Sequence, residues 1–279
     1  MDEKLKQVEQ ILKKYGQEQL LQGYNRQPGE KEKEEFLNDL LTIDFAQIEK
    51  LYEASKKAKD FSESKIEPID FVDKSKLSKE EYAKYEKIGS EKIKEGKLAV
   101  VTMAGGQGTR LGHTGPKGTY DLGLDSHKSI FEILTDTLNE ARKKYGVDIP
   151  WYIMTSEENN EATVNFFKEH KFFGYPESCV TFFKQGKLPM LSTDGKVLLN
   201  EEGKIKEAAD GHGGIFQSML KDGVIFDMKS RGIEWVFIGG VDNVLVNMVD
   251  AVLIGLAEEK HVLAAGKSIV KAGPKEKVG

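Results

Sequence analysis

The stretch that decides the fold runs from residue 98 to residue 118 and reads LAVVTMAGGQGTRLGHTGPKG. It begins with four apolar residues, 98–101, a run typical of a central parallel strand that is covered on both faces. A glycine-rich loop follows this strand. Gly105, Gly106 and Gly108 lack a Cβ, so the backbone can turn sharply and bring its N–H groups close to an anion.

Two basic side chains belong to the same loop, Arg110 directly after the glycines and Lys117 after a proline. Arg110 can make a bidentate, charge-assisted contact with an oxyanion, and Lys117 adds a mobile point charge. An ordinary tight turn requires neither of these residues. The loop therefore predicts a phosphate site.

The loop matches neither of the two commonest nucleotide-binding patterns. A Walker loop requires G-x-x-x-x-G-K-[ST], and no Gly-Lys-Ser/Thr follows Gly105 or Gly106 at that spacing. A dinucleotide-binding loop requires G-x-G-x-x-G opening into a helix, whereas residues 106–111 read GQGTRL and Pro116 would break a helix. Both patterns are disfavoured.

Composition limits the classes of protein to which the chain can belong. The net charge of −5 argues against a general nucleic-acid binder, so any phosphate affinity must be local. The single cysteine, Cys179, excludes an intramolecular disulfide and a cysteine-based metal cluster. No stretch approaches the roughly 20 apolar residues of a membrane span, and the N-terminus lacks the apolar core of a signal peptide. We expect a cytoplasmic protein with neither a membrane nor a nucleic-acid partner.

Residues 1–95 are charge-dense, and their apolar residues recur at helical spacing. Heptads are not sustained, so we expect a helical region that packs on the main domain rather than a coiled coil. Ser78 and Glu81 predict a capping box at the start of a helix that ends near Gly96.

From residue 96 the sequence alternates between strands and helices. Strands are predicted at residues 98–101, 151–154, 180–183 and 235–238, separated by helical segments. This order is typical of βαβ units, and it predicts an α/β fold with a Rossmann-like, doubly wound and mostly parallel sheet over residues 96–279. Ligands of such sheets bind at the carboxyl ends of the strands.

Polar residues follow two of the later strands. Ser156 follows the second strand, where it can either meet a ligand or cap the next helix. Gln185 follows the third strand and offers an amide donor and a carbonyl acceptor, the pair needed to read the N3–H and a carbonyl of uracil. Alone, a glutamine before a glycine is usually a turn residue.

Two further candidates come later in the chain. The segment DGHGG, 210–214, permits close approach of a ligand to the backbone before a helix, and its His212 is either a ligand contact or a solvated loop residue. Asp242 comes directly after the last predicted strand. A carboxylate there suits Mg²⁺ that also holds substrate phosphates, although Asp242 can equally cap the following helix.

The pattern G-G-x-G-T-R-L-G followed by P-K resembles the signature of sugar nucleotidyltransferases. The residues AGGQGTRLG…GPKGTYDLGL resemble the UDP-N-acetylglucosamine pyrophosphorylase branch of the UDP-sugar pyrophosphorylase family. Four later blocks match that family in the expected order: WYIMTSEENNEATVNFFKEHKFFG (151–174), FFKQGKLPMLSTDGKVLL (182–199), DGHGG (210–214) and VDNVLV (241–246). The resemblance covers residues 95–279.

The resemblance implies the nucleotide-diphospho-sugar transferase fold and a uridylyltransferase that converts UTP and N-acetylglucosamine 1-phosphate into UDP-N-acetylglucosamine and pyrophosphate, with Mg²⁺ as cofactor. It implies catalytic roles for Arg110 on the departing phosphates and Lys117 on the α-phosphate or incoming phosphate. His212 would contact the sugar phosphate, and Asp242 would hold the metal. The UTP-binding residues would be Met103, Ala104, Gly105, Gly106, Gly108, Thr109, Lys117, Gln185, Gly211 and Asp242.

The sequence departs from that branch in two respects. The N-acetylglucosamine branch has Asn at the position of His212, and D-G-H-G is closer to the glucose 1-phosphate branch, so a glucose- or galactose-1-phosphate uridylyltransferase is the alternative. In the family, further strands, the sugar-binding half and a later phosphate-contacting lysine follow the position of Gly279. We therefore expect a nucleotide-binding domain that is incomplete at its C-terminus, for which a non-catalytic uridine-nucleotide-binding fragment is the second alternative.

Overall fold

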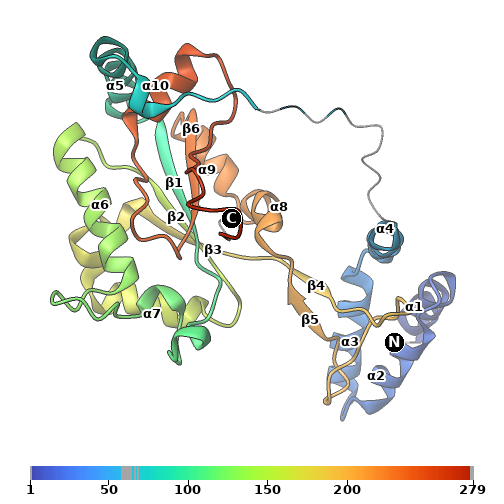
Figure 1. Cartoon of the computed structure of the whole chain (residues 1–279). Helices are drawn as coiled ribbons and strands as arrows, with labels where there is room; N and C mark the ends of the chain where they lie inside the picture. The colour runs from blue at the N-terminus through green and yellow to red at the C-terminus, as the bar shows by residue number, and fades with distance from the viewer. Residues whose placement is uncertain (1, 58–64, 66, 68, 277–279) are drawn as a thin grey trace. The chain divides into compact units, whose positions relative to one another are not determined.

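A computed structural model describes residues 2–57, 65, 67 and 69–276 (Figure 1). The chain divides into two compact units. The N-terminal unit consists of Met1–Asp70 together with Lys187–Asp210, and the sheet unit consists of Phe71–Gly186 together with Gly211–Gly279.

The N-terminal unit is helical with one antiparallel strand pair. Its elements are α1 (Asp2–Lys14), α2 (Leu21–Arg26), α3 (Glu30–Thr42), α4 (Phe45–Lys56), β4 (Lys187–Pro189) and β5 (Glu207–Ala209). The apolar stripes of the helices form one core, in which Leu12 and Leu37 are fully buried and which Val197 of the later segment joins. The predicted helical character is confirmed here.

The boundary between the units differs from the predicted boundary at residue 95. Helix α5 (Lys79–Lys94) lies in the sheet unit, where it packs against α10 (Ala251–Glu259). A Cβ on Gly89 would lie only 1.9 Å from the carbonyl oxygen of Ala251, so the two helices touch through backbone. The Ser78–Glu81 capping box at the start of α5 is confirmed.

The sheet unit contains four parallel strands in the order β3-β2-β1-β6, which confirms the predicted fold class. The strands are β1 (Leu98–Met103), β2 (Trp151–Thr155), β3 (Val180–Lys184) and β6 (Trp235–Gly240). The helices between them are α6 (Ile130–Tyr145), α7 (Asn160–Glu169), α8 (Ile215–Lys221) and α9 (Val224–Ser230). Short 3₁₀ turns complete the chain: η1 (Glu18–Leu20), η2 (Lys74–Lys76), η3 (Thr109–Leu111), η4 (Lys117–Thr119), η5 (Lys171–Gly174), η6 (Glu177–Cys179) and η7 (His212–Gly214).

The helices cover both faces of the sheet (Figure 1). On one face, Val100 and Ile153 pack with α6 and α7 through side chains such as Leu138. On the other face, Val101 and its neighbours pack with Met219 of α8 and with α9. The alternation of side chains along each strand sends successive apolar residues to opposite cores, and this explains the unbroken apolar run in β1.

The strand order places a topological switch point between β1 and β6. The chain passes from β1 to β2 and β3 in one direction and then returns to β6 on the other side of β1. Ligands of open α/β sheets bind in the crevice outside the carboxyl ends of the strands at such a point. The register pairs Met103 with Gly240, so the loops after β1 and β6 begin at the same level.

Candidate functional site

Four loops leave the carboxyl edge of the sheet, one after each parallel strand. The glycine-rich loop follows β1, Ser156 follows β2, Gln185 follows β3 and Asp242 follows β6. Parallel pairing brings the ends of these strands to one edge, as the sequence predicted.

No helix in the described residues is both long and apolar enough to cross a membrane.

The glycine-rich loop closes on itself through the backbone. The N–H of Gly108 donates to the carbonyl of Gly115 over 2.9 Å, and the N–H of Lys117 donates to the carbonyl of Gly106 over 3.1 Å. Within the described part of the chain, the N–H groups of three consecutive residues, 105–107, have no acceptor. Backbone N–H groups without an acceptor in a glycine-rich loop are available as donors to an anion.

Gln185 lies against this loop. A Cβ built on Gly105 would lie 2.6 Å from the Oε1 of Gln185, whereas a Cβ on Gly106 would meet nothing within 4 Å. The backbone N–H of Gln185 donates to the carbonyl of Thr155 over 2.8 Å, and this bond extends the pairing of β3 with β2 by one residue. The structure therefore brings two of the predicted uridine-binding positions, 105 and 185, into contact.

Lys117 and Asp242 form an ion pair between their side chains. Lys117 stands in the turn that follows Pro116, and Asp242 stands after β6, so the pair connects the loops on the two sides of the switch point. The Lys117 side chain is 28% exposed and the Asp242 side chain 63% exposed. Both groups are thus accessible from solvent, a cation for a phosphate and a carboxylate for a metal.

The interpretation of Asp242 as a helix cap is wrong. The next helix, α10, begins at Ala251, and its N-cap is Asp250, whose side chain accepts from the N–H of Leu253. Seven residues, 243–249, lie between Asp242 and that cap. Its position after β6 therefore has no capping role to explain it.

Ser156 caps the turn that leads into the next helix, and not that helix itself. The N-cap of α7 is Asn159, and the Ser156 hydroxyl accepts from the Asn159 N–H over 3.3 Å within the preceding turn. Asn159 was not predicted from the sequence as a site residue. Its side chain is fully buried at 1% exposure and reaches the glycine-rich loop.

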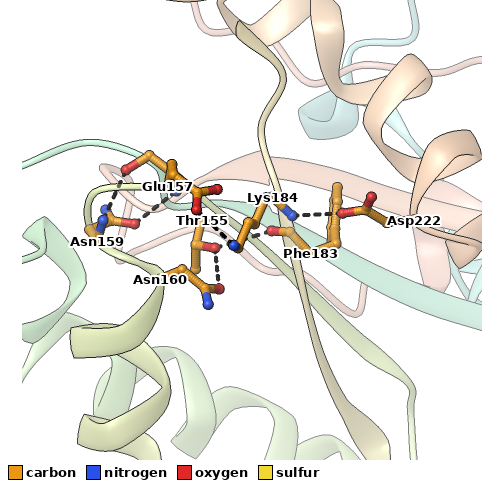
Figure 2. Close-up of polar contacts among 8 residues, drawn as sticks. Thr155, Glu157, Asn159, Asn160, Phe183, Lys184 and Asp222 are labelled. Atoms are coloured by element: carbon orange, nitrogen blue, oxygen red, sulfur yellow. Dashed lines mark hydrogen bonds and ion pairs between the residues drawn. The ribbon is translucent and has the colours of Figure 1, made fainter. Parts of the chain in front are cut away.

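A polar network fixes the ends of β2 and β3 (Figure 2). The Lys184 backbone N–H donates to Asp222 over 3.0 Å, and the Lys184 ammonium pairs with Glu157 over 3.0 Å. The Thr155 hydroxyl, buried between the strands, bonds to Asn160 over 2.7 Å. The network holds the backbone directly before Gln185, and no periodic pattern in the sequence indicates it.

Arg110 and Thr109 lie in η3, directly after the glycines. Both side chains are exposed, and Arg110 has no acidic partner among the described residues. The guanidinium is therefore available to an oxyanion, although no protein contact links it to Lys117 or Asp242.

Gly211 and His212 lie in the loop before α8. Gly211 has a φ of +76°, a conformation that glycine adopts without strain. His212 is exposed in η7, and among the described residues no hydrogen bond or ion pair joins it to Gln185, Lys117 or Asp242. Their predicted contacts with UTP and the sugar phosphate stay predictions.

The donor set at the switch point fits a magnesium ion that is shared with phosphates. The described residues contain no cluster of three His, Cys, Asp or Glu side chains able to hold a metal by themselves. Mg²⁺ is commonly held by one or two carboxylates, with substrate phosphates and water completing its octahedron. The exposed carboxylate of Asp242 meets that requirement.

The architecture and the loop after β1 can be compared with known proteins. The family model described as UTP–glucose-1-phosphate uridylyltransferase matches residues 44–279. The chain belongs to this family. The resemblance predicted from the glycine-rich loop and the four later blocks is confirmed.

Named relatives share a large part of the chain. It is 39% identical to UDP-N-acetylglucosamine diphosphorylase 2 of Arabidopsis thaliana, over 96% of this chain and 56% of that protein. It is 41% identical to the UDP-N-acetylglucosamine pyrophosphorylase of Saccharomyces cerevisiae, over 70% of this chain and 42% of that protein. The chain spans about half the length of the curated relatives that it matches.

A solved structure has the same fold. The uridine diphosphate N-acetylglucosamine pyrophosphorylase of Trypanosoma brucei, solved in complex with an inhibitor, superposes with a TM-score of 0.72 at 27% identity. The match covers 94% of this chain and 55% of that one.

Proposed function

We propose that the chain is a uridylyltransferase that converts UTP and N-acetylglucosamine 1-phosphate into UDP-N-acetylglucosamine and pyrophosphate. The observation that carries this proposal is the contact between Gln185 and Gly105 beside three free backbone N–H groups. An amide suited to uracil thus lies next to donors suited to phosphate. The names of the relatives point to the same reaction.

The reaction joins two anions, so their repulsion is the main obstacle. An oxygen of the sugar phosphate attacks the α-phosphorus of UTP, a new P–O bond forms, and the bond to the β-phosphate oxygen breaks to release pyrophosphate. Catalysis is then mostly positioning and neutralisation of charge, without a protein nucleophile. The backbone donors of residues 105–107 hold the triphosphate, Arg110 stabilises the departing phosphates, and Lys117 receives the α-phosphate or the incoming phosphate.

Asp242 is the residue that would hold Mg²⁺. A bound cation supplies positive charge to the phosphate oxygens between which the transfer takes place. The Lys117 ammonium pairs with the same carboxylate. Lys117 must leave Asp242 in order to reach a phosphate, so we expect the ion pair to open when nucleotide and metal bind together.

His212 supports a second candidate substrate. Because the D-G-H-G loop is closer to the glucose 1-phosphate branch, glucose 1-phosphate or galactose 1-phosphate is the alternative acceptor, and the family description names the glucose reaction. The relatives at 39% and 41% identity favour N-acetylglucosamine 1-phosphate.

We propose the cytoplasm as the location, because the composition of the sequence indicates that compartment.

Two measurements test the proposal. Titration calorimetry should show UTP binding in preference to ATP, because the Gln185 amide offers the donor and the acceptor that match the N3–H and a carbonyl of uracil. Product formation from UTP with each of the three sugar 1-phosphates then identifies the acceptor. UTP binding without any product would favour the non-catalytic uridine-nucleotide-binding fragment, and equal or tighter binding of ATP would contradict the uracil site.

Asp242→Asn tests the metal assignment. Asparagine keeps the shape and removes the charge, so we expect Mg²⁺ to strengthen UTP binding by the wild-type chain and to lose that effect in the variant, with an unchanged melting temperature. Asp125→Asn, a change at an exposed loop carboxylate, is the matched control. An identical response to Mg²⁺ in both variants would remove Asp242 from the metal site.

A further inference from the structure

The side chain of Asn159 occupies a position where asparagine usually caps a helix, yet it does not cap one. Asn159 is the N-cap of α7 but makes no side-chain bond to that helix. Its Oδ1 instead accepts from the Ser156 N–H over 2.8 Å, and its Nδ2 donates to the carbonyls of Ala104 over 3.0 Å and Gly106 over 3.3 Å. This amide therefore ties the end of β2 to the loop after β1.

The two carbonyls to which the Asn159 side chain donates belong to residues 104 and 106, with one residue between them. Holding these carbonyls fixes the direction of the backbone N–H groups in the loop. A trans peptide unit is planar, so its N–H points away from its carbonyl. Holding the carbonyls of residues 104 and 106 thus turns the N–H groups of Gly105 and Gln107 away from Asn159. These are two of the three N–H groups that have no acceptor within the described residues.

The Gly106 carbonyl accepts a hydrogen bond from a second donor besides Asn159. The oxygen of Gly106 also accepts from the Lys117 N–H over 3.1 Å, so one acceptor joins α7, the glycine-rich loop and the turn that carries Lys117. A carbonyl that keeps only one of its two donors is held less firmly in its direction, and its peptide gains freedom to rotate. Rotation of that peptide would move the Gln107 N–H out of its present direction.

We propose that Asn159 is a positioning residue that aims the N–H groups of Gly105 and Gln107 at the phosphates of the nucleotide. The inference rests on the proposed function, because it takes UTP as the ligand of the loop. The Asn159 amide bonds to Ser156, Ala104 and Gly106 and acts on the nucleotide through the loop. Among side chains of its size, an amide alone supplies both the acceptor for Ser156 and the donors for the two carbonyls.

Asn159→Asp is the sharpest variant. Aspartate keeps the size and the acceptor for the Ser156 N–H, but it places a carboxylate oxygen against two carbonyl oxygens, so the loop peptides lose their orientation. The probes are inorganic tripolyphosphate, uridine and UTP, titrated into the full chain and followed by NMR. We expect Asn159→Asp to weaken tripolyphosphate and UTP by at least about 10-fold and to leave uridine within about twofold.

Asn160→Asp is the matched control. Asn160 is the next residue in the chain, and its Oδ1 only accepts from Thr155, a bond that aspartate can also accept. We expect this variant to bind all three probes within about twofold of the wild type. The milder Asn159→Ser variant replaces the two N–H donors by one shorter hydroxyl without adding charge. If Asn159→Asp unfolds, Asn159→Ser should weaken tripolyphosphate and UTP and leave uridine unchanged.

The outcomes separate this inference from the proposed function. A folded Asn159→Asp chain that binds tripolyphosphate as well as the wild type does would overturn the positioning role alone. Equal weakening of tripolyphosphate and uridine in both Asn159 variants would also overturn it, since that is the result of a general structural role. A wild-type chain that binds tripolyphosphate but not uridine would contradict the uridylyltransferase and keep the positioning role, and one that binds no tripolyphosphate would overturn the positioning role.

Discussion

The two units of the molecule use buried amide side chains for different ends. In the N-terminal unit, Gln17 donates to the carbonyl of Gly195 over 3.0 Å and accepts from the N–H of Val197 over 2.9 Å. In the sheet unit, Asn159 satisfies the carbonyls on one side of the glycine-rich loop, while the N–H groups on the other side have no acceptor in the described chain. The first arrangement is a closed structural joint, and the second leaves solvent-accessible donors that a ligand can use.

The comparison predicts that Gln17 affects stability and not binding. Gln17→Leu removes both bonds and leaves a backbone N–H and a carbonyl buried without partners, so we expect a loss of about 3 kcal/mol in the free energy of unfolding. Urea denaturation followed by circular dichroism measures this loss. The affinity of the folded variant for UTP should equal that of the wild type.

A control within the same helical segment shows whether the effect belongs to the buried bonds. Gln22 is exposed in α2, so Gln22→Leu should change the free energy of unfolding by less than about 0.5 kcal/mol. If the two variants were equally stable, the joint between Gln17 and the segment around Gly195 would not be the closed structural element that we describe.

In contrast to Gln17, Arg110 should affect activity and not stability. It is exposed and has no acidic partner among the described residues, so Arg110→Ala should leave the melting temperature unchanged. We expect kcat/KM for uridylyl transfer to fall by about 10²-fold, because the charge that develops on the departing pyrophosphate loses a stabilising partner. Lys143→Ala, which removes an exposed charge from α6, should alter neither quantity. Unchanged kcat/KM in Arg110→Ala would end its assignment to the leaving group.

Gln185 has both a structural and a binding part. Its backbone is hydrogen-bonded to the sheet, and its side chain lies against the glycine-rich loop. We expect Gln185→Ala to weaken UTP binding by about 1–2 kcal/mol through the loss of hydrogen bonds to a neutral base. Gly105→Ala would drive a Cβ to 2.6 Å from the Gln185 Oε1 and should also weaken binding.

Calorimetry on the double variant makes the contact itself measurable. With Gln185 already truncated, the Gly105→Ala change meets no side chain there and should cost much less than it does alone. Additive losses would show that Gln185 and Gly105 act on UTP independently.

The sequence was a good guide to the sheet and to its edge. Apolar runs predicted the four parallel strands, and their order implied that Gly105, Gln185 and Asp242 follow strand ends at one edge. The division into units was not predictable by the same means, because α5 joins the sheet unit through a backbone contact at Gly89 and the segment 187–210 joins the other unit through Gln17. Such long-range contacts leave no periodic pattern.

Asn159 was missed for a different reason. An asparagine before a helix has an ordinary explanation as an N-cap, and only the coordinates show that its amide faces the glycine-rich loop instead. Capping of the next helix was likewise an alternative explanation for Asp242, and α10 begins too far along the chain for it. In both cases the local rule was sound, and tertiary contacts decided the outcome.

The smallest effect is expected on the face of the sheet away from the phosphate loop, at Asp227 of α9. The buried Tyr152 hydroxyl donates to Asp227 over 2.6 Å, and Arg231 pairs with the same carboxylate over 2.8 Å. The bond from Tyr152 is the main cause that lowers the pKa of Asp227 below its ordinary value of 3.8, against an opposing contribution from burial, and Arg231 lowers it further. Unlike the glycine-rich loop, this is a saturated polar cluster.

A carboxyl whose pKa is lower in the folded state stabilises the fold above its unfolded pKa, and this contribution disappears as the pH falls through the folded pKa. Asp227→Asn keeps an acceptor for Tyr152 and removes the charge, so we expect a loss of about 0.5–1 kcal/mol at pH 7, limited by the solvent exposure of the carboxylate. The difference from the wild type should shrink once the pH drops below about 4 and should vanish when both side chains are neutral. Urea denaturation between pH 7 and pH 3 measures it, with Glu202→Gln at an exposed pair as the control. A difference that stayed constant over that range would show that the Asp227 charge does not contribute to the stability of the sheet unit.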